Sequence, residues 1–218
     1  MPIIDLTFVL QGTTIPLDAG YALFAAISRI VPSIHGDRRI GVHSIRGMKL
    51  QPGRLTLVPQ SKLRLRMPSE EVITYLPLGG AKLDLDGSRL SVGVPRTEPL
   101  VAAPVVSSRL VTIGHHQEPD EFLASVNRQL KEMGVTARAE FLPSPDPRHA
   151  GQPSRRIITV KDRKVVGYPI VVSGLTAEES LTVQEQGLGS RRRMGCGLFV
   201  RTPDRPGHFD HVHAREEV

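Results

Sequence analysis

The sequence lacks tryptophan, contains one cysteine and has no long apolar segment. Aromatic residues make up only 4% of the chain, which disfavours a broad aromatic surface for stacking single-stranded bases. The single cysteine, Cys196, excludes an internal disulfide framework and fits a reducing, cytoplasmic location. No run of about 18 apolar residues occurs, so no membrane-spanning helix is expected. The opening segment, MPIIDLTFVL, has no basic region and predicts a first strand rather than a signal peptide.

Positive charge is what the chain has in excess. Its 28 lysines and arginines outnumber 22 acidic residues, and the formal net charge is +6. A basic balance attracts polyanions, and phosphate backbones are the commonest of these partners. No basic amphipathic helix favours a membrane surface, so we expect nucleic acid as the partner and no membrane. The 218 residues suffice for one large domain or for two domains of about 100 residues each.

The first half of the chain combines strand and helix patterns. Apolar residues recur at helical spacing over residues 20–31, where Leu23, Ile27 and Ile30 share one face. The segment KLRLRM, residues 62–67, alternates with period two and predicts a strand with one apolar and one basic face. The full prediction for this half is strands over 3–10, 40–48, 54–58 and 62–67, helices over 20–31 and 70–76, and two short strands around the turn Asp86-Gly87.

The second half repeats this order after a proline-containing connection at residues 98–104. A helix with one apolar face is expected over 120–133, and Gly134 ends it. Thr176 and Glu179 have the spacing of a capping box, which begins a helix that runs to about Gln186. The predicted strands are 109–114, 136–142, 156–160, 165–173 and 198–201, with a proline-rich loop over 143–153.

Each half therefore has the order β-α-β-β-α-β, which is typical of a ferredoxin-like unit. We predict an α+β fold of two tandem ferredoxin-like (RRM-like) domains with a C-terminal glycine-rich loop. The N-terminal domain is expected over residues 1–104 and the C-terminal domain over residues 105–218.

The glycine-rich loop follows the last predicted helix. It runs GLGSRRRMGCG over residues 187–197, so that two Gly-x-Gly pairs flank three arginines. Glycine permits close backbone approach to a ligand, arginine makes bidentate contacts to phosphate, and a nest of backbone amides would suit a phosphodiester. The loop lacks the lysine of a nucleotide P-loop and the third glycine of a dinucleotide-binding fingerprint. A flexible turn with solvated arginines is the alternative.

This loop carries a resemblance to a known family. The pattern Gly-hydrophobic-Gly, five residues, Gly-hydrophobic-Gly near the C-terminus is similar to that of the repeat-associated mysterious proteins, the RNA-binding proteins of CRISPR systems. Tandem ferredoxin-like domains with this loop resemble the CRISPR repeat-processing endoribonucleases. The segments HGD at 35–37, IGVH at 40–43 and IRG at 45–47 resemble the myxococcal subtype. The glycine loop is shared with non-catalytic members, and the histidine-bearing segments favour the nuclease.

The resemblance implies cleavage of RNA without a metal ion or other cofactor. In such enzymes the ribose 2′-hydroxyl attacks the adjacent phosphate, leaving 2′,3′-cyclic phosphate and 5′-hydroxyl ends. Histidine suits the proton transfers because its pKa lies near neutrality. His35 is our first candidate and His43 the second, and joint action of the two is the alternative. DNA lacks the attacking hydroxyl, so it is not expected as a direct substrate.

Arginines and lysines are expected to hold the phosphates. Arg38, Arg39 and Arg46 are candidates for stabilising charge at the scissile phosphate, with Ser33 or Tyr21 as groups that position it. The remaining expected RNA contacts are the glycines and arginines of the loop and two basic segments: Gly187, Gly189, Arg191, Arg192, Arg193, Gly195 and Gly197; Lys62, Arg64 and Arg66; and Arg155, Arg156, Lys161, Arg163 and Lys164. Solvated basic turns are the alternative for the hairpin residues and for Arg38 and Arg39.

The partners implied by the resemblance are a CRISPR repeat RNA with a stem-loop, the mature guide RNA and other subunits of a CRISPR effector complex. A non-catalytic RNA-binding subunit of such a complex is the alternative function. His208, His211 and His213 resemble a metal cluster, but no cysteine or carboxylate spacing completes a known site, so we predict no metal centre. His115, His116 and His149 carry no motif, and Cys196 has no partner for a nucleophilic role.

Overall fold

The computed structural model describes residues 1–114, 118–142, 144 and 152–202. By internal contacts the chain divides into two compact units. The first unit contains Met1–Leu100 together with Arg192–Gly195, and the second contains Val101–Arg191 and the residues from Cys196 onward. A short stretch of the glycine-rich loop thus belongs to the first unit, although the chain on either side of it belongs to the second.

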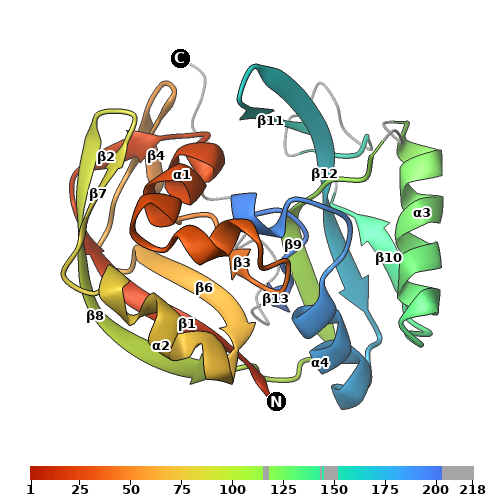
Figure 1. Cartoon of the computed structure of the whole chain (residues 1–218). Coiled ribbons are helices and arrows are strands. Elements are labelled where there is room, and N and C mark those ends of the chain that lie inside the picture. Colours follow the sequence, from red (N-terminus) through yellow and green to blue (C-terminus); the bar gives the residue numbers. More distant parts are fainter. Residues whose placement is uncertain (115–117, 143, 145–151, 203–218) are drawn as a thin grey trace. The chain divides into compact units, whose positions relative to one another are not determined.

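The first unit is built on a five-stranded antiparallel sheet with the strand order β3-β6-β1-β8-β7. Apart from the added strand β7, this is the order expected when a β-α-β-β-α-β chain folds with its first and third strands at the centre. Figure 1 shows β1, β6 and β8 side by side. The strands are β1 (Ile3–Gln11), β3 (Gly41–Val42), β6 (Lys62–Pro68), β7 (Lys82–Leu85) and β8 (Ser88–Pro99).

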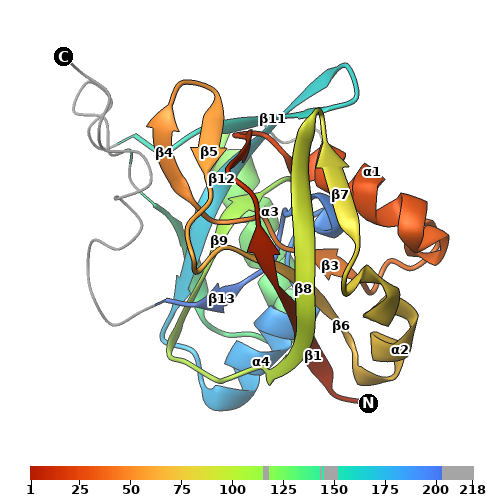
Figure 2. The same ribbon diagram turned by 90° about the vertical axis from the view of Figure 1, so that its left-hand side faces the viewer.

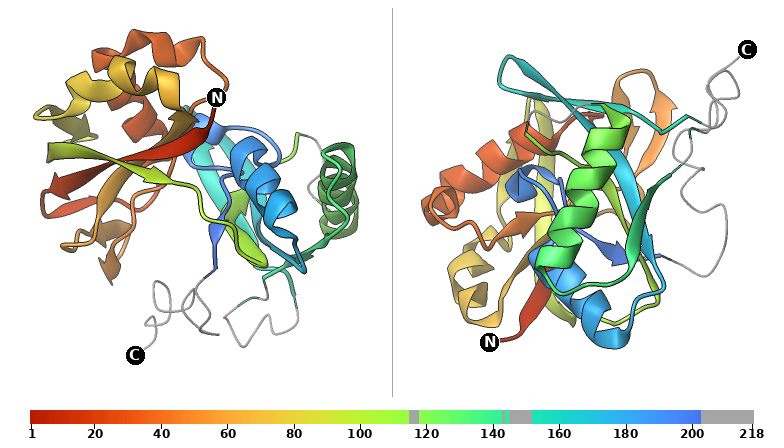
Figure 3. Two further views of the ribbon diagram at one scale, coloured as in Figure 1. Left: turned by 90° about the horizontal axis from the view of Figure 1, so that it is seen from below. Right: turned by 90° about the vertical axis from the view of Figure 1, so that its right-hand side faces the viewer.

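Helices cover one face of this sheet, because alternate residues of the central strands are apolar and point toward them (Figure 3). Leu6 and Phe8 of β1 are buried against Leu23 and Ile27 of α1, and Tyr75 of α2 joins the same core. The helical segments are α1 (Gly20–Ile30), η1 (Pro32–His35), η2 (Ser69–Glu71), α2 (Val72–Tyr75) and η3 (Leu76–Leu78).

A second, smaller sheet completes the first unit. It contains β2 (Thr14–Pro16), β4 (Met48–Gln51) and β5 (Arg54–Thr56), in the order β2-β5-β4. The β4–β5 hairpin, orange in Figure 2, turns at Pro52 and Gly53. Gly53 has a φ of +68°, a conformation that glycine adopts without strain.

The second unit has a four-stranded antiparallel sheet with the order β10-β12-β9-β13, and β11 pairs with β12 beside it. Phe122 and Val126 of α3 and Val183 of α4 share a core with Val106 and Ile170 of the sheet. Figure 3 shows α3, green, lying across this unit. The elements are β9 (Val105–Val111), α3 (Pro119–Glu132), β10 (Arg138–Phe141), β11 (Arg156–Val160), β12 (Arg163–Ser173), α4 (Ala177–Gln186), η5 (Arg192–Met194) and β13 (Val200–Arg201).

Several expected boundaries differ from the structure. The strand expected over residues 40–48 is divided into β3 and β4, which belong to different sheets. Gly47 marks the division, because its backbone packs so closely on Leu55 and Thr56 that a Cβ atom would overlap them. The strand expected over 109–114 is β9 instead, which begins at Val105 and ends at Val111. The strand β8 is longer than expected and reaches into the expected connection.

Other local expectations are confirmed. The capping box is present, since Thr176 Oγ1 accepts a hydrogen bond from the amide of Glu179 and the Glu179 carboxylate accepts one from the amide of Thr176. The helix α3 ends at Glu132, and Gly134 follows with a φ of +77°. None of the helices in the described ranges has the length and apolar character needed to cross a lipid bilayer.

Candidate active site and RNA interface

His35 lies at the end of η1, directly after α1. Pro32 begins this 3-10 turn with its backbone already restricted to a helical φ, and the buried Ile34 anchors the turn in the core. The His35 residue is exposed, and its ring meets the ring of Phe24 edge-on with 5.0 Å between centroids. The imidazole is therefore held at the surface against α1, where a substrate can reach it.

Arg193 of η5 contacts the same place. Its Nη1 donates a 2.6 Å hydrogen bond to the carbonyl of Ile34 and a second, short one to the carbonyl of His35. Its guanidinium carbon lies 5.4 Å from the centroid of the Phe24 ring. The histidine and an arginine that are 158 positions apart in sequence are thus brought together within the first unit.

The neighbouring arginines differ in their surroundings. Arg39 is held by three carboxylates: it lies 2.7 Å from Asp37, 2.5 Å from Glu71 and 3.5 Å from Glu70. This ion-pair network lowers the pKa of Asp37, chiefly through the hydrogen bonds from Arg39. Arg38 is exposed beside it. Arg39 was expected to stabilise the scissile phosphate, but its charge is already matched by carboxylates, which leaves Arg38 and Arg193 as the better-placed cations near His35.

His43 has a different environment. It follows β3, its side chain is 13% exposed, and its Nε2 lies 3.7 Å from Oδ1 of Asp5. Burial lowers the pKa of His43 to about 4, and the charge of Arg66 acts in the same direction while Asp5 opposes it. His43 is therefore a neutral imidazole at neutral pH.

Asp5 and Arg66 form a buried ion pair beside His43. Nε and Nη2 of Arg66 donate to Oδ1 and Oδ2 of Asp5 at 2.8 and 2.9 Å. Burial alone would raise the pKa of Asp5, but the hydrogen bonds from Arg66 and the nearby His43 outweigh it and hold this pKa well below its usual range. Arg66 was expected on an RNA-binding face. With only 1% of its surface exposed, it instead belongs to the interior, because its guanidinium is the partner of a buried carboxylate.

Lys62 and Arg64 occupy the more exposed part of the same sheet face. Lys62 Nζ lies 3.2 Å from Oε1 of Glu98, and Arg64 Nη2 lies 3.5 Å from Oε2. Burial raises the pKa of Glu98, but Lys62 and Arg64 together lower this pKa by more than burial raises it, so the net shift is downward. Both cations line a groove of about 480 Å³ in the first unit, together with residues from the loops before β4 and β6: His43, Ser44, Arg46, Val58, Pro59 and Gln60.

The groove therefore brings together four residues that the sequence placed in two different groups. His43 and Arg46 were candidates for catalysis, and Lys62 and Arg64 were candidates for RNA binding. His35 does not line this groove. The first unit thus presents two surroundings for a candidate histidine, one at the surface beside Arg193 and one recessed among basic side chains.

The glycines of the loop are used for internal packing. The amides of Gly187, Gly189 and Gly197 donate to the Val183 carbonyl, to Gln129 Oε1 and to the Leu110 carbonyl at 2.9, 2.8 and 2.7 Å. The Gly195 amide donates to the Arg192 carbonyl at 3.2 Å. We expected these four glycines to form a nest of amides for phosphate. The structure differs, because all four N–H groups already have acceptors within the protein.

The basic hairpin of the second unit is formed by β11 and β12. Arg155, Lys161, Arg163 and Lys164 are exposed, and Lys161 adopts a φ of +54° at the turn. Arg156 is more enclosed: burial lowers its pKa to about 10, and the charge of Arg109 adds to this. Arg191 of the loop is exposed with a φ of +64°. These residues present positive charge on the second unit, as expected for contacts to phosphate.

Comparison with known proteins assigns the chain to a family. The family model described as "Cas6 Crispr" matches residues 4–203. Over 200 residues, which are 92% of this chain and 82% of its relative, the sequence is 42% identical to the CRISPR-associated endonuclease Cas6 of Myxococcus xanthus strain DK1622. The chain belongs to the Cas6 family. The predicted resemblance to CRISPR repeat-processing endoribonucleases of myxococcal type is thereby confirmed, and so is the prediction of an enzyme, a CRISPR-associated endonuclease.

Solved structures support the fold. A CRISPR-associated Cas6 protein matches with a TM-score of 0.67 at 14% identity, covering 92% of this chain and 100% of its own. A protein described as a RAMP protein binding different RNA substrates matches with a TM-score of 0.62 at 14% identity, covering 92% of this chain and 99% of its own. The predicted α+β fold of tandem ferredoxin-like units, which is that of Cas6 proteins, is confirmed.

Some residues of this Cas6 family member were missed at the sequence level. Asp5 and Phe24 were not singled out, although Asp5 is an acidic residue in the middle of an apolar strand, which is a signal for a buried partner. Glu98 was assigned to a connection, yet it lies on β8 opposite Asp5. His115, His116, His149, His208, His211, His213 and most of the expected loop at 143–153 lie outside the described residues. Within the described part, no group of three or more histidine, cysteine or acidic side chains could hold a metal ion.

Proposed function

We propose that this protein binds CRISPR repeat RNA and cleaves the precursor transcript once within each repeat, by attack of a ribose 2′-hydroxyl and without a metal ion. Membership of the Cas6 family supplies the class of reaction. The observation that carries the residue assignment is the position of the exposed His35, whose backbone carbonyl accepts a hydrogen bond from Arg193 within the first unit. The likeness to a protein that binds different RNA substrates supports RNA as the ligand.

The chemistry places a proton-transfer group next to a cation. His35 takes the proton from the 2′-hydroxyl or gives one to the leaving 5′-oxygen, because imidazole exchanges protons near neutral pH. Arg193 and Arg38 stabilise the additional negative charge on the phosphate as the new bond forms. The products are a 2′,3′-cyclic phosphate and a 5′-hydroxyl. Ser33, exposed in the same turn, is available to position the phosphate.

The groove lined by His43, Arg46, Lys62 and Arg64 binds a stretch of the RNA backbone. Glu98 pairs with Lys62 and Arg64, and Asp5, which lies 3.8 Å from Arg64, is already matched by Arg66, so the cations of the groove are in excess and a phosphate adds favourable charge there. His43 remains neutral, and it lines the groove as a hydrogen-bonding group rather than acting as the acid or base. The hairpin β11–β12 and Arg191 bind the stem of the repeat through its phosphates and shape.

The decisive experiment uses the repeat RNA from the protein's own genome in the presence of EDTA. We expect cleavage at one position per repeat, with a cyclic phosphate on the upstream product. A substrate with a single 2′-deoxy substitution at the cut site should bind normally and remain intact. Loss of cleavage with the chelator, or cleavage of the deoxy substrate, would contradict the proposed reaction.

Alanine substitutions separate His35 from His43. His35→Ala is expected to lower the single-turnover rate by about 100- to 10,000-fold, the usual contribution of a positioned acid or base, and to leave the RNA dissociation constant nearly unchanged. His43→Ala should affect the rate much less. If the native protein binds repeat RNA without cutting it, the protein is a non-catalytic RNA-binding subunit instead.

The products are expected to stay with the protein. We propose that the 3′ product, the mature guide RNA with its stem-loop, remains bound and carries the protein into a CRISPR effector complex. A burst of product equal to the enzyme concentration, followed by slow release, is the expected kinetic pattern. Sustained turnover at excess RNA would contradict retention of the guide.

A further inference from the structure

Glu98 of β8 contacts two cations of β6 from across the intervening strand. Lys62 Nζ donates a 3.2 Å hydrogen bond to Oε1 of Glu98, and Arg64 Nη2 lies 3.5 Å from Oε2. Because β6 and β8 flank β1, their backbones are about 10 Å apart, and only long side chains can meet across that distance. Thr7 of β1 is small and buried, and its hydroxyl donates to Oε1 of Glu98 at 3.1 Å. The Glu98 carboxylate is therefore directed over β1 toward the cations.

These contacts differ in burial from the ion pair of Asp5 and Arg66. The side chains of Lys62, Arg64 and Glu98 are between 32% and 39% exposed. Exposed ion pairs contribute little net free energy, since water solvates their members well when they separate. Asp5 also lies 3.8 Å from Arg64, but it is buried and bound by Arg66. Glu98 is thus the carboxylate whose contacts with the two cations can be exchanged at small cost.

The same two cations line the groove of about 480 Å³, whereas Glu98 is not among its lining residues. Lys62 and Arg64 therefore contact a carboxylate of the protein and also border a space that a ligand can enter. A carboxylate and a phosphodiester both offer negatively charged oxygens that accept charge-assisted hydrogen bonds from ammonium and guanidinium groups. Glu98 thus uses donors that an RNA phosphate in the groove would also use.

We propose that Glu98 is a specificity-determining residue, whose carboxylate competes with the RNA phosphate for Lys62 and Arg64. This inference rests on the proposed function, because it takes the groove as a site for RNA. Giving up the Glu98 contacts lowers the affinity for every RNA that enters the groove by the same factor. A repeat RNA that binds tightly still saturates the protein, while RNA of other sequences, which binds weakly, occupies it less often.

The alternative is that Glu98 orders the two cations for RNA. In that case its contacts would hold Lys62 and Arg64 in the conformation that RNA requires, and losing the carboxylate would weaken binding. A competing carboxylate has the opposite effect, because its loss frees both cations. The sign of the change in affinity therefore separates the two roles.

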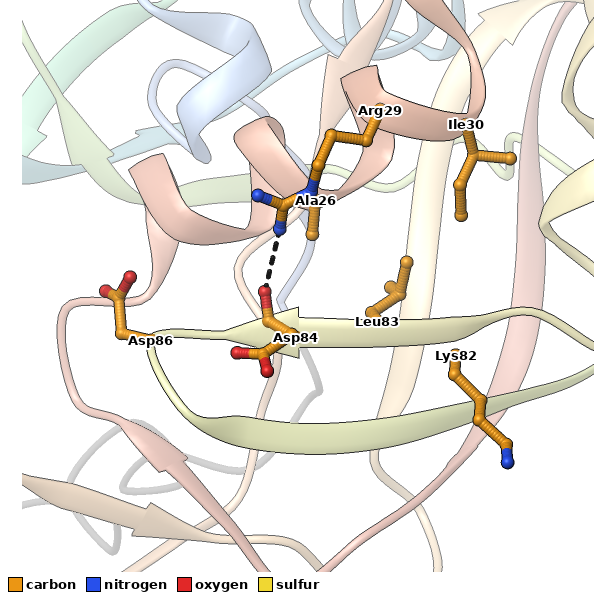
Figure 4. A pocket seen from close by; sticks show the side chains of 7 residues that line it. All are labelled: Ala26, Arg29, Ile30, Lys82, Leu83, Asp84 and Asp86. Carbon is orange, nitrogen blue, oxygen red and sulfur yellow. Dashed lines mark hydrogen bonds between the residues drawn. The ribbon is translucent and has the colours of Figure 1, made fainter.

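The test compares Glu98→Gln with Asp86→Asn. Glutamine keeps the shape of the side chain and removes its charge. Asp86 is an exposed carboxylate of the same unit, at the turn between β7 and β8 and beside a pocket of about 390 Å³ that is lined by residues of α1 and β7 (Figure 4). Its φ of +51° suits asparagine as well as aspartate. Asp86→Asn therefore controls for the loss of one negative charge.

Binding is measured at equilibrium and low salt with a repeat RNA that carries a 2′-deoxy substitution at the cut site. We expect Glu98→Gln to lower the dissociation constant by about 3- to 10-fold, the size expected when two exposed ion pairs no longer have to be broken. Asp86→Asn should change it by less than about twofold. Weaker or unchanged binding by Glu98→Gln, with a native circular dichroism spectrum, would overturn the proposal.

RNA of unrelated sequence and equal length should gain affinity in Glu98→Gln by the same factor as the repeat. This follows because the competition concerns a phosphate, which every RNA carries. A gain confined to the repeat would show that other RNA does not enter the groove, and the proposed effect on selectivity would be wrong.

The effect of Glu98 should depend on its two partners. In a protein that already carries Lys62→Gln and Arg64→Gln, the further change Glu98→Gln should give little or no gain in affinity, because no cation remains to be released. An undiminished gain would mean that Glu98 acts only by general repulsion of RNA and would overturn the competition.

A measurement without RNA separates failure of this inference from failure of the proposed function. Pyrophosphate is titrated into the free protein while the side-chain NMR signals of Lys62 and Arg64 are followed. In Glu98→Gln these signals should reach saturation at a several-fold lower pyrophosphate concentration than in the native protein. Equal titrations, or signals that do not respond in Glu98→Gln, would overturn the competition. The expected difference without any binding of repeat RNA would instead retain the anion site and reject the proposed function.

Discussion

Asp5 and Arg66 lie directly opposite each other on β1 and β6, and the guanidinium of Arg66 donates a hydrogen bond to each oxygen of the Asp5 carboxylate. Both members of this pair are buried, since Asp5 is 5% exposed and Arg66 is 1% exposed. Because the pairing holds the pKa of Asp5 below its usual range, its contribution to folding is present above the ordinary carboxyl pKa of about 4 and is lost as the pH falls below it.

Replacing one member of this pair should be costly. Asp5→Asn leaves Arg66 buried without a counter-charge, and we expect the free energy of unfolding to fall by about 3–5 kcal/mol. Urea denaturation followed by circular dichroism measures this loss. The matched control is Glu132→Gln on α3, whose partner Arg128 is 3.9 Å away and where both side chains are about two-thirds exposed. That change should cost less than about 0.5 kcal/mol, and an equal loss at the two sites would contradict the assignment.

The buried His43 should make stability depend on pH. Its pKa is about 4 in the folded protein, below the ordinary value of 6.5, so the unfolded chain binds a proton first as the pH falls. Stability is therefore complete above pH 6.5 and declines toward pH 4, by at most about 1.4 kcal/mol per pH unit.

This decline can be assigned to one residue. The free energy of unfolding, measured by urea titration between about pH 5 and pH 7, should lose most of its slope in His43→Asn, since titration of this residue supplies it. His35→Asn should keep the slope, because the side chain of His35 is exposed. A slope that survives in His43→Asn would show that other groups titrate in this range.

The basic groove should govern the salt dependence of RNA binding. Lys62→Gln, Arg64→Gln and Arg46→Gln each remove one cation that lines it. Each should reduce the slope of the logarithm of affinity against the logarithm of salt concentration by about 1 and weaken binding at low salt. Lys131→Gln, at an exposed position on α3, serves as the control and should leave the slope unchanged. Equal effects in all four variants would indicate only a general loss of charge.

The last glycine of the loop should tolerate no side chain. Gly197 has a φ of +68°, and a Cβ atom there would overlap the carbonyl of Leu188. Gly174 has a similar φ of +76° but open space around it. Gly174→Ala should cost about 1–2 kcal/mol through backbone strain alone. Gly197→Ala should cost about 1–3 kcal/mol more through overlap, and equal unfolding free energies of the two variants would contradict the packing argument.

Local patterns of apolar and polar residues along the sequence predicted most of the helices and strands. The alternation over residues 62–67 predicted β6, and Leu63, Leu65 and Met67 are indeed buried. The same alternation could not separate Arg66 from Lys62, because the difference depends on Asp5, a partner 61 positions away. Burial of a charge is decided by what lies across the sheet, and a local pattern does not contain that information.

The candidate site was predictable in part for the same reason. His35 and His43 were found through a local resemblance, but their unlike surroundings arise from Phe24, Asp5 and Arg193. The glycine loop was predicted to bind phosphate because glycine permits close approach. It permits close approach to the protein's own backbone as well, as Gly197 and Leu188 show, and composition does not distinguish the two uses.

Because Arg192–Gly195 belongs to the first unit, the boundary between the halves is not a place where the polypeptide can be divided without loss. A fragment that stops at Leu100 would contain His35 without Arg193. A split protein would carry His35 and Arg193 on separate polypeptides, and under the proposed mechanism cleavage would then require both pieces to be supplied together.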